Sequence, residues 1–244
     1  MSTDQSDSFV NVSYEEFAKC QIPLYHGPIV SIRIGAETYN VSKTLLCHHS
    51  PYFGVMFEGQ FKEAADQSAE LAEVPGVVSN RSFELLLQWL YLGRFILADE
   101  SPTDRITAMI ELARLADMAE IHDANMDAQI ARFIQSTVLD NPPKDNNWRR
   151  SPNTNIHHIT TEHIAAASHL PKGHPVRLLF ARASIDAYLH SEDFRFSNEF
   201  HDVPEFAGDL LHELRGALES FKYGRGNSRT YHDPFLGKEL PFRE

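Results

Sequence analysis

The sequence predicts an α+β fold, in which a small three-stranded sheet is covered by a helical cluster and followed by an α-helical C-terminal extension. Between residues 13 and 139, a few short strand patterns alternate with several helical patterns. Residues 157–223 repeat apolar side chains at helical spacing only. The stretch Asp140–Asn147 between them is rich in proline and asparagine, and it cannot continue a helix or a sheet. We therefore expect a domain boundary there.

Composition excludes several classes of protein. The chain has 244 residues, of which 42% are hydrophobic, and a formal net charge of −12, so it can bury a core but lacks the basic surface of a nucleic-acid binder. Residues 1–140 alone carry 9 basic and 20 acidic side chains. No stretch approaches a membrane span, the polar start does not resemble a signal peptide, and two cysteines are too few for a disulfide framework. We expect an intracellular protein, cytoplasmic and/or nuclear, with no nucleic-acid or membrane partner.

The first structural elements follow from local signals. Ser13–Glu16 is a capping box, which predicts a short helix that ends before Pro23. Ile29–Ile34 alternates apolar and polar residues as a half-buried strand does. After a turn, Thr38–Val41 is expected to form the return strand of a hairpin.

Two helices and a third strand are expected next. Ser42 can cap a helix that carries Leu45 and Leu46, and Pro51 occupies the first-turn position of a second helix. Gly59 is expected to end that helix as a left-handed cap. Ala69–Val74 fits a third short strand.

Three further helices complete the first region. Residues 80–91 place apolar side chains on one helical face, and Gly93 is the expected stop. Ser101-Pro102 provides an N-cap followed by a first-turn proline for the next helix. A last helix carries apolar side chains from Met126 to Val138.

Six segments in this order resemble the BTB/POZ domain, and most closely the version common in fungal proteins. The resemblance covers about residues 25–138 and implies the fold described above. It also implies protein–protein recognition without catalysis, either by self-association or by recruitment of another protein. Some relatives are substrate adaptors of cullin-type ubiquitin ligases. The segments are Gly27–Gly35, Val41–Leu46, Ser50–Phe57, Phe61–Glu63, Phe83–Tyr91 and Leu112–Asp117.

The resemblance also implies a partner-binding set. Cullin-binding relatives often carry a hydrophobic-x-Glu motif after the second core helix, and Phe61-Lys-Glu63 matches it. An exposed aromatic side chain beside a carboxylate suits an interface. We add Tyr52 and Met56 of the preceding helix as expected partner-binding residues. The alternative interpretation is that Phe61 covers an edge of the core and Glu63 is merely solvated.

Two positions depart from the family pattern. Gly27-Pro28 stands where the family usually has an aspartate before the first strand, and Ser42 stands where it usually has a histidine. The aspartate region supports a homodimer in many relatives, so this departure bears on dimerisation and not on the fold.

The second half is expected to be helical. After a linker at 140–156, Thr160 or Thr161 can cap a helix, Pro175 can open a longer one, and Phe206–Phe221 repeats apolar residues at helical spacing. We expect a disordered tail at 224–244, and a disordered N-terminus at 1–12.

Chemical motifs give little support for catalysis or metal binding, and we expect no cofactor. The histidines between residues 157 and 174 are spaced so that they do not share one helical face, and their simpler roles are helix caps and surface positions. A metal-binding or enzymatic protein that uses this segment is the remote alternative. Cys47-His48-His49 cannot converge on one ion, because adjacent helical residues point about 100° apart. Cys47 is expected to be a small buried residue. The histidines of the segment are His157, His158, His163, His169 and His174.

Overall fold

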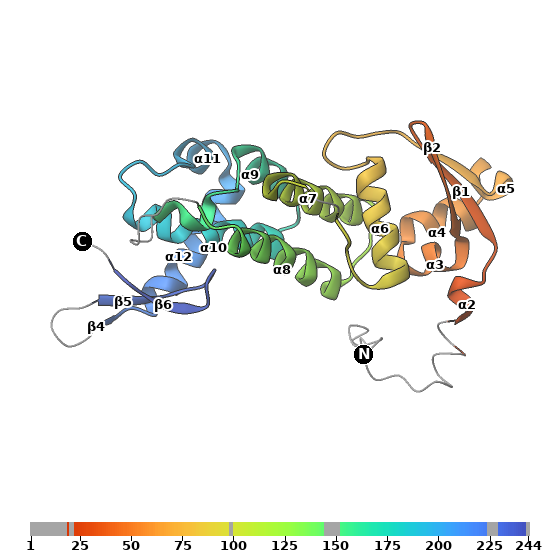
Figure 1. The fold of residues 1–244 in the computed structure, drawn as a ribbon. Helices are drawn as coiled ribbons and strands as arrows, with labels where there is room; N and C mark the ends of the chain where they lie inside the picture. Colours follow the sequence, from red (N-terminus) through yellow and green to blue (C-terminus); the bar gives the residue numbers. More distant parts are fainter. Residues whose placement is uncertain (1–18, 20–21, 98–99, 144–151, 224–228, 243–244) are drawn as a thin grey trace. The chain divides into compact units, whose positions relative to one another are not determined.

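The computed structural model describes residues 19, 22–97, 100–143, 152–223 and 229–242 (Figure 1). The chain forms two compact units, which are residues 1–98 with 111–126 and residues 99–110 with 127–244. The expected disordered N-terminus at 1–12 and the capping box Ser13–Glu16 lie outside the described residues.

The division between the units falls earlier in the chain than the expected boundary near Asp140. It lies within two 17-residue helices, α7 (Pro102–Met118) and α8 (Ala124–Asp140). The reason is that α8 belongs to the second core: Ile130, Ile134 and Val138 are all buried there. The proline- and asparagine-rich stretch therefore interrupts the second unit instead of preceding it.

The first unit is built on a three-stranded sheet with the order β2-β1-β3. Strand β1 (Ile29–Ile34) pairs antiparallel with β2 (Glu37–Ser42) and parallel with β3 (Ser68–Leu71). Every second residue of β1 is fully buried, which confirms the alternation read from the sequence. The third strand is shorter than expected, because Val74 leaves the sheet and forms an isolated bridge with Val78.

Serine side chains begin the two helices beside this sheet. The hydroxyl of Ser42 accepts the Leu45 backbone N–H and caps α3 (Lys43–His49). The hydroxyl of Ser50 accepts the Phe53 backbone N–H and caps α4 (Pro51–Glu58), with Pro51 in its first turn. Both serines are fully buried. The expected starts of both helices are thus confirmed with their side-chain caps.

The remaining elements of the first unit are α2 (Ile22–Tyr25), α5 (Lys62–Asp66) and α6 (Asn80–Leu92). Pro23 lies in the first turn of α2, where a proline costs no helical hydrogen bond, and the helix expected before it lies almost entirely outside the described residues. Gly93 ends α6 with a φ of 63°, as the sequence predicts.

The second unit is organised around a helix most of whose residues are buried. In α10 (Pro175–His190), even Arg177 and Asp186 are buried. Arg177 Nε donates to Asp209 Oδ2 at 2.7 Å, and its Nη1 donates to the Leu170 carbonyl, so the buried charge is paired. Its other elements are η2 (Pro152–Ile156), α9 (Thr161–Ser168), α11 (Ser197–Asp202), α12 (Pro204–Glu219), β4 (Lys222–Tyr223), β5 (Arg229–Asp233) and β6 (Lys238–Pro241).

The expectation of a disordered tail at 224–244 is wrong for its described part. Strands β4, β5 and β6 form a second antiparallel sheet. Tyr231 and Asp233 are buried because alternate positions of β5 face the same side, and Phe235 is buried in the turn that follows. The Asp233 carboxylate accepts the backbone N–H groups of Phe235 and Leu236, and Gly237 adopts a φ of 65° in the turn. The tail is therefore part of the second core.

We predict that Tyr231→Phe destabilises the second unit by about 1 to 3 kcal/mol. The Tyr231 hydroxyl donates to Asp186 Oδ1 at 2.9 Å inside the core, and its removal leaves a buried carboxylate oxygen with one donor fewer. Urea unfolding followed by circular dichroism measures the change. The matched control is Tyr223→Phe, because that side chain is 78% exposed. Equal free energies of unfolding for the two variants would contradict the prediction.

Candidate protein-interaction surface

Helix α4 has one buried and one exposed side. Phe53 and Phe57 are one turn apart and fully buried, and the two rings are stacked with centroids 6.4 Å apart. Val55 points away from that side and is 60% exposed. Tyr52 and Met56 lie between the two sides and are half-buried. The helix therefore carries an apolar strip that the first unit does not cover.

Gly59 brings Phe61 next to this strip. A Cβ atom at Gly59 would lie 2.3 Å from the Val55 carbonyl oxygen and 3.4 Å from the Phe61 ring. The backbone of Gly59 thus passes so close to the end of α4 that only glycine fits. Its φ is −78°, so the expected left-handed cap is wrong, although the helix does end there. Close packing, and not a left-handed turn, is the reason for the glycine.

The short helix α5 is fixed at its other end by Gln67. This residue has a φ of 47°, and its side-chain amide donates to the carbonyl of Ala64. Its own carbonyl accepts the backbone N–H of Ser31 in β1 at 3.0 Å. Phe61 and Glu63 therefore sit on a segment that is held between α4 and the sheet.

We define the α4–α5 surface as Tyr52, Val55, Met56, Phe61 and Glu63. Phe61 is 58% exposed and Glu63 is half-exposed in the first turn of α5. Sequence reasoning proposed four of these residues but missed Val55. The spacing of Phe53 and Phe57 was the available signal, since it identifies the buried side of α4 and leaves Val55 opposite.

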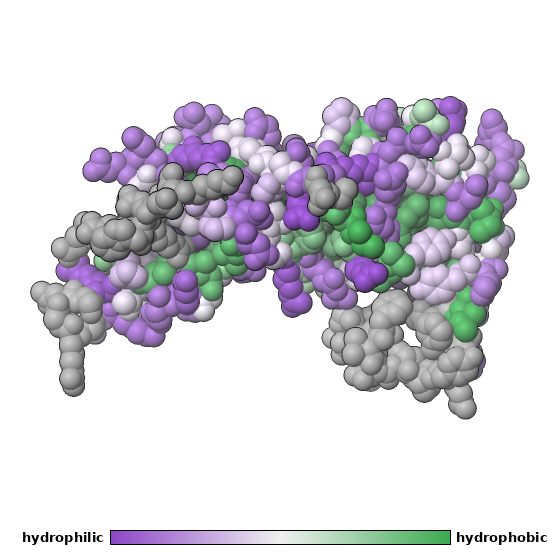
Figure 2. All heavy atoms as spheres, viewed as in Figure 1, coloured by the Kyte–Doolittle hydropathy of each residue, from purple (hydrophilic) through white to green (hydrophobic). Residues whose placement is uncertain are grey.

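Other apolar side chains of the first unit are also exposed, including Ile29, Leu92 and Ile96. Figure 2 shows such side chains at the surface between hydrophilic ones on one face of the molecule. Isolated exposed apolar residues are normal in soluble proteins. In the α4–α5 surface, the Phe61 ring lies near the carboxyl end of α4, because the ring and the Val55 carbonyl oxygen both lie within 4 Å of the position that a Cβ atom at Gly59 would occupy.

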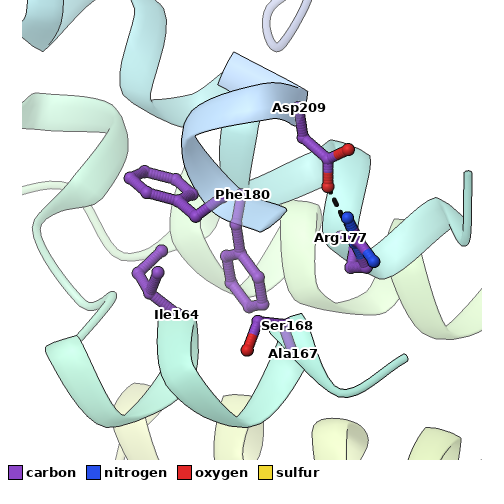
Figure 3. Close-up of a pocket in the computed structure, with 7 residues that line it drawn as sticks. Ile164, Ala167, Ser168, Arg177, Phe180 and Asp209 are labelled. Carbon is purple, nitrogen blue, oxygen red and sulfur yellow. Dashed lines mark hydrogen bonds and ion pairs between the residues drawn. The ribbon is translucent and has the colours of Figure 1, made fainter. Parts of the chain in front are cut away.

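A hollow in the second unit is too small for a ligand. It has a volume of about 10 Å³, which is the space of one water molecule. Figure 3 shows that Ile164 and Phe180 line it together with the ion pair Arg177–Asp209. The two charged groups of this hollow are paired with each other, and the Ser168 hydroxyl that also lines it donates to the Ala165 carbonyl.

Three histidines of the histidine-rich segment form hydrogen bonds with the backbone or lie within hydrogen-bond distance of it. His163 Nδ1 accepts the Thr160 backbone N–H, which completes the capping box of α9, and His174 Nδ1 accepts the Val176 N–H at the start of α10. His158 Nε2 lies 2.8 Å from the Asn141 carbonyl oxygen. Among the described residues, no group of three or more histidine, cysteine, aspartate or glutamate side chains is arranged to hold a metal ion.

Cys47 is half-buried, and its thiol donates to the Phe53 carbonyl at 3.5 Å. Burial raises the pKa of the Cys47 thiol, which disfavours the reactive thiolate. Within the described part of the chain, no helix is both long and apolar enough to span a membrane.

Comparison with protein-family models identifies the family of residues 30–132. Residues 30–132 match the family model of the BTB/POZ domain. This segment is a BTB/POZ domain. Its small sheet, its helical cluster and the helical extension that follows it confirm the fold class read from the sequence. BTB/POZ domains bind partner proteins and dimerise, and they are generally non-catalytic.

One solved structure with detectable similarity is the BTB domain of zebrafish PATZ1. It is 18% identical in sequence, with a TM-score of 0.30, and the match covers 46% of this chain and 75% of that one.

We predict that Gly59→Ala destabilises the BTB/POZ domain by about 1 to 3 kcal/mol, because the new methyl group would overlap the Val55 carbonyl. Gly54→Ala is the matched control in the same helix. A Cβ atom there would meet only the Cys47 carbonyl oxygen at 3.8 Å, so this change should stabilise α4 by about 0.5 to 1 kcal/mol. Free energies of unfolding in urea distinguish the two, and changes of the same sign would contradict the packing role of Gly59.

We predict that His163 makes the second unit less stable in acid. Burial lowers the pKa of His163 to about 4, so the unfolded chain binds a proton between pH 6.5 and 4 that the folded chain does not. Stability should be complete above pH 6.5 and fall by at most about 3 kcal/mol as the pH drops to 4.

Glutamine is the appropriate replacement, because at this capping-box position it can still accept the Thr160 N–H but does not titrate. His163→Gln should flatten the profile of unfolding free energy against pH, whereas His212→Gln, at an exposed site, should not. Identical profiles for wild type and His163→Gln would refute this role.

Proposed function

We propose that this chain is a non-catalytic adaptor that binds a partner protein through the α4–α5 surface of its BTB/POZ domain. The observation that carries the proposal is the exposure of Val55 and Phe61 on adjacent, well-anchored segments. An aromatic side chain in this position contributes little to the core of its own domain. It is available to contact a second protein, and aromatic residues are enriched at the centres of protein interfaces.

The surroundings of Gly27 favour recruitment of a different protein over self-association. A Cβ atom at Gly27 would lie 2.0 Å from Thr44 Oγ1 and 2.8 Å from Thr44 Cβ. A side chain such as the aspartate that is usual in the family would therefore require Thr44 to move. The neighbouring Ser42 hydroxyl already caps α3 and donates to the Leu24 carbonyl. Gly27 and Ser42, the two departures from the family pattern, therefore lie close together, since a Cβ atom at Gly27 would be 3.2 Å from the Ser42 hydroxyl oxygen.

A cullin-type ubiquitin ligase is the second, more specific candidate for the partner. It is favoured by Phe61 and Glu63, which match the hydrophobic-x-Glu motif and are both accessible. In that case the chain would be a substrate adaptor, and the BTB/POZ domain would contact the cullin scaffold.

The test is a pulldown with the purified full chain and a cullin, together with identification of proteins captured from cell extract. We expect Phe61→Ala and Glu63→Lys to reduce capture of the partner at least about tenfold. Leu92→Ala is the matched control, since Leu92 is 54% exposed on α6. All variants should keep the circular dichroism spectrum of the wild type.

The outcomes separate the candidates. If the wild type does not bind the cullin, the cullin role is refuted, whereas capture of another protein that depends on Phe61 still supports recruitment. Light scattering tests self-association directly: a dimer that Phe61→Ala leaves intact, combined with no Phe61-dependent partner, would overturn the proposed use of this surface.

A further inference from the structure

The α4–α5 surface has an acidic rim. Glu58 is exposed at the end of α4, Glu63 lies in the first turn of α5, and Asp66 follows one turn later with its side chain 53% exposed. Phe61 lies between Glu58 and Glu63 in the chain. Carboxylate side chains thus precede and follow Phe61 within three residues of the chain.

The single basic side chain of this segment does not neutralise the rim. Lys62 Nζ lies 3.9 Å from Asp66 Oδ2, in an i,i+4 pair on the surface of α5. This leaves Glu58 and Glu63 without a cation from residues 58–66, which carry three acidic side chains and one basic one. The carboxyl end of α4 adds the partial negative charge of its helix dipole next to Gly59.

We propose that the partner presents one large apolar side chain flanked by two basic side chains, arginine or lysine, to the α4–α5 surface. This inference rests on the proposed function and specifies the chemistry of the partner. The apolar side chain would cover Val55 and Phe61, while the basic groups would meet Glu58 and Glu63. Charges at an interface rim accelerate association and exclude partners of like charge.

The same charges argue against a second copy of this chain as the occupant. Two α4–α5 surfaces placed face to face would bring the carboxylates of Glu58 and Glu63 from both copies together. Like charges that meet across an interface repel each other and weaken binding, so the carboxylates disfavour this arrangement.

Three fluorescein-labelled peptides test the inference with the full chain. The first has a central Leu-Phe pair flanked by lysines, the second has glutamates in place of the lysines, and the third has Ala-Ala in place of Leu-Phe. Fluorescence polarisation should give at least about tenfold weaker binding for the second and third peptides. Binding of the first should weaken as salt concentration rises.

Charge-reversal variants then locate the site. Glu58→Lys and Glu63→Lys should each weaken binding of the lysine-flanked peptide about five- to tenfold and reduce its salt dependence. Glu192→Lys, at an exposed position of the second unit, is the matched control and should have no effect beyond a general change in net charge. Phe61→Ala should weaken binding of the same peptide.

Failure of this inference differs from failure of the proposed function. Equal affinity for the lysine- and glutamate-flanked peptides, or no binding of the lysine-flanked peptide at about 1 mM, would overturn the basic-partner inference. If Phe61-dependent capture of a natural partner persists in that case, the proposed function stands. Peptide binding that is insensitive to Phe61→Ala would place the basic-binding site elsewhere and overturn the inference as well.

Discussion

The buried hydroxyl of Ser50 links the start of α4, the helix that carries Val55, to the chain just beyond α7. It accepts the Phe53 backbone N–H and so begins α4, and it donates to the carbonyl of Ala119 at 2.6 Å, just beyond α7. One side chain thus satisfies two backbone groups that are 66 residues apart in the chain. Because Ser50 is fully buried, loss of either hydrogen bond would leave a buried polar group that water cannot reach and that has lost its hydrogen-bond partner. The first turn of α4 is therefore fixed to the chain just after α7 through this serine.

Local signals were sufficient to predict most of the first unit. The caps at Ser42 and Ser50, the first-turn Pro51 and the stop at Gly93 all act within one helical turn, and the structure places each of them as expected. Strand β1 was predictable for the same reason, since its alternation is a property of consecutive residues. Features of this kind need no information from distant parts of the chain.

The features that the sequence did not predict depend on distant contacts. The tail folds because Tyr231 reaches Asp186 and because the Asn155 amide donates to Asp233, which are pairs separated by 45 and 78 residues. Gly59 was recognised as a helix stop, but its close approach to the Val55 carbonyl is visible only in three dimensions. The division of the compact units within α7 and α8 was not predicted, because a proline-rich interruption does not reveal which core the preceding helix joins.

The histidine-rich segment shows how neighbouring groups determine the role of a titratable residue. His163 Nδ1 accepts a backbone N–H, so the proton of the neutral ring lies on Nε2, which is 2.9 Å from Thr107 Oγ1. The threonine hydroxyl in turn donates to the Thr103 carbonyl. Both ring nitrogens of His163 thus form hydrogen bonds within the protein. In its neutral form the His163 ring links α9 to α7. A ligand role would require one of these bonds to break.

The energetics of the α4–α5 surface explain why its charged rim matters. Burial of the exposed part of Phe61 would contribute about 2 to 3 kcal/mol, and Val55 would add about 2 kcal/mol. Association of two proteins costs at least about 4 kcal/mol in lost freedom, so these two side chains alone approximately offset that cost. The anchoring of Gly59 and Gln67 lowers the further cost of ordering the segment. In the proposed complex these two side chains leave little net affinity, so the choice of partner would rest on further contacts, and the carboxylates of Glu58 and Glu63 would act on specificity and association rate.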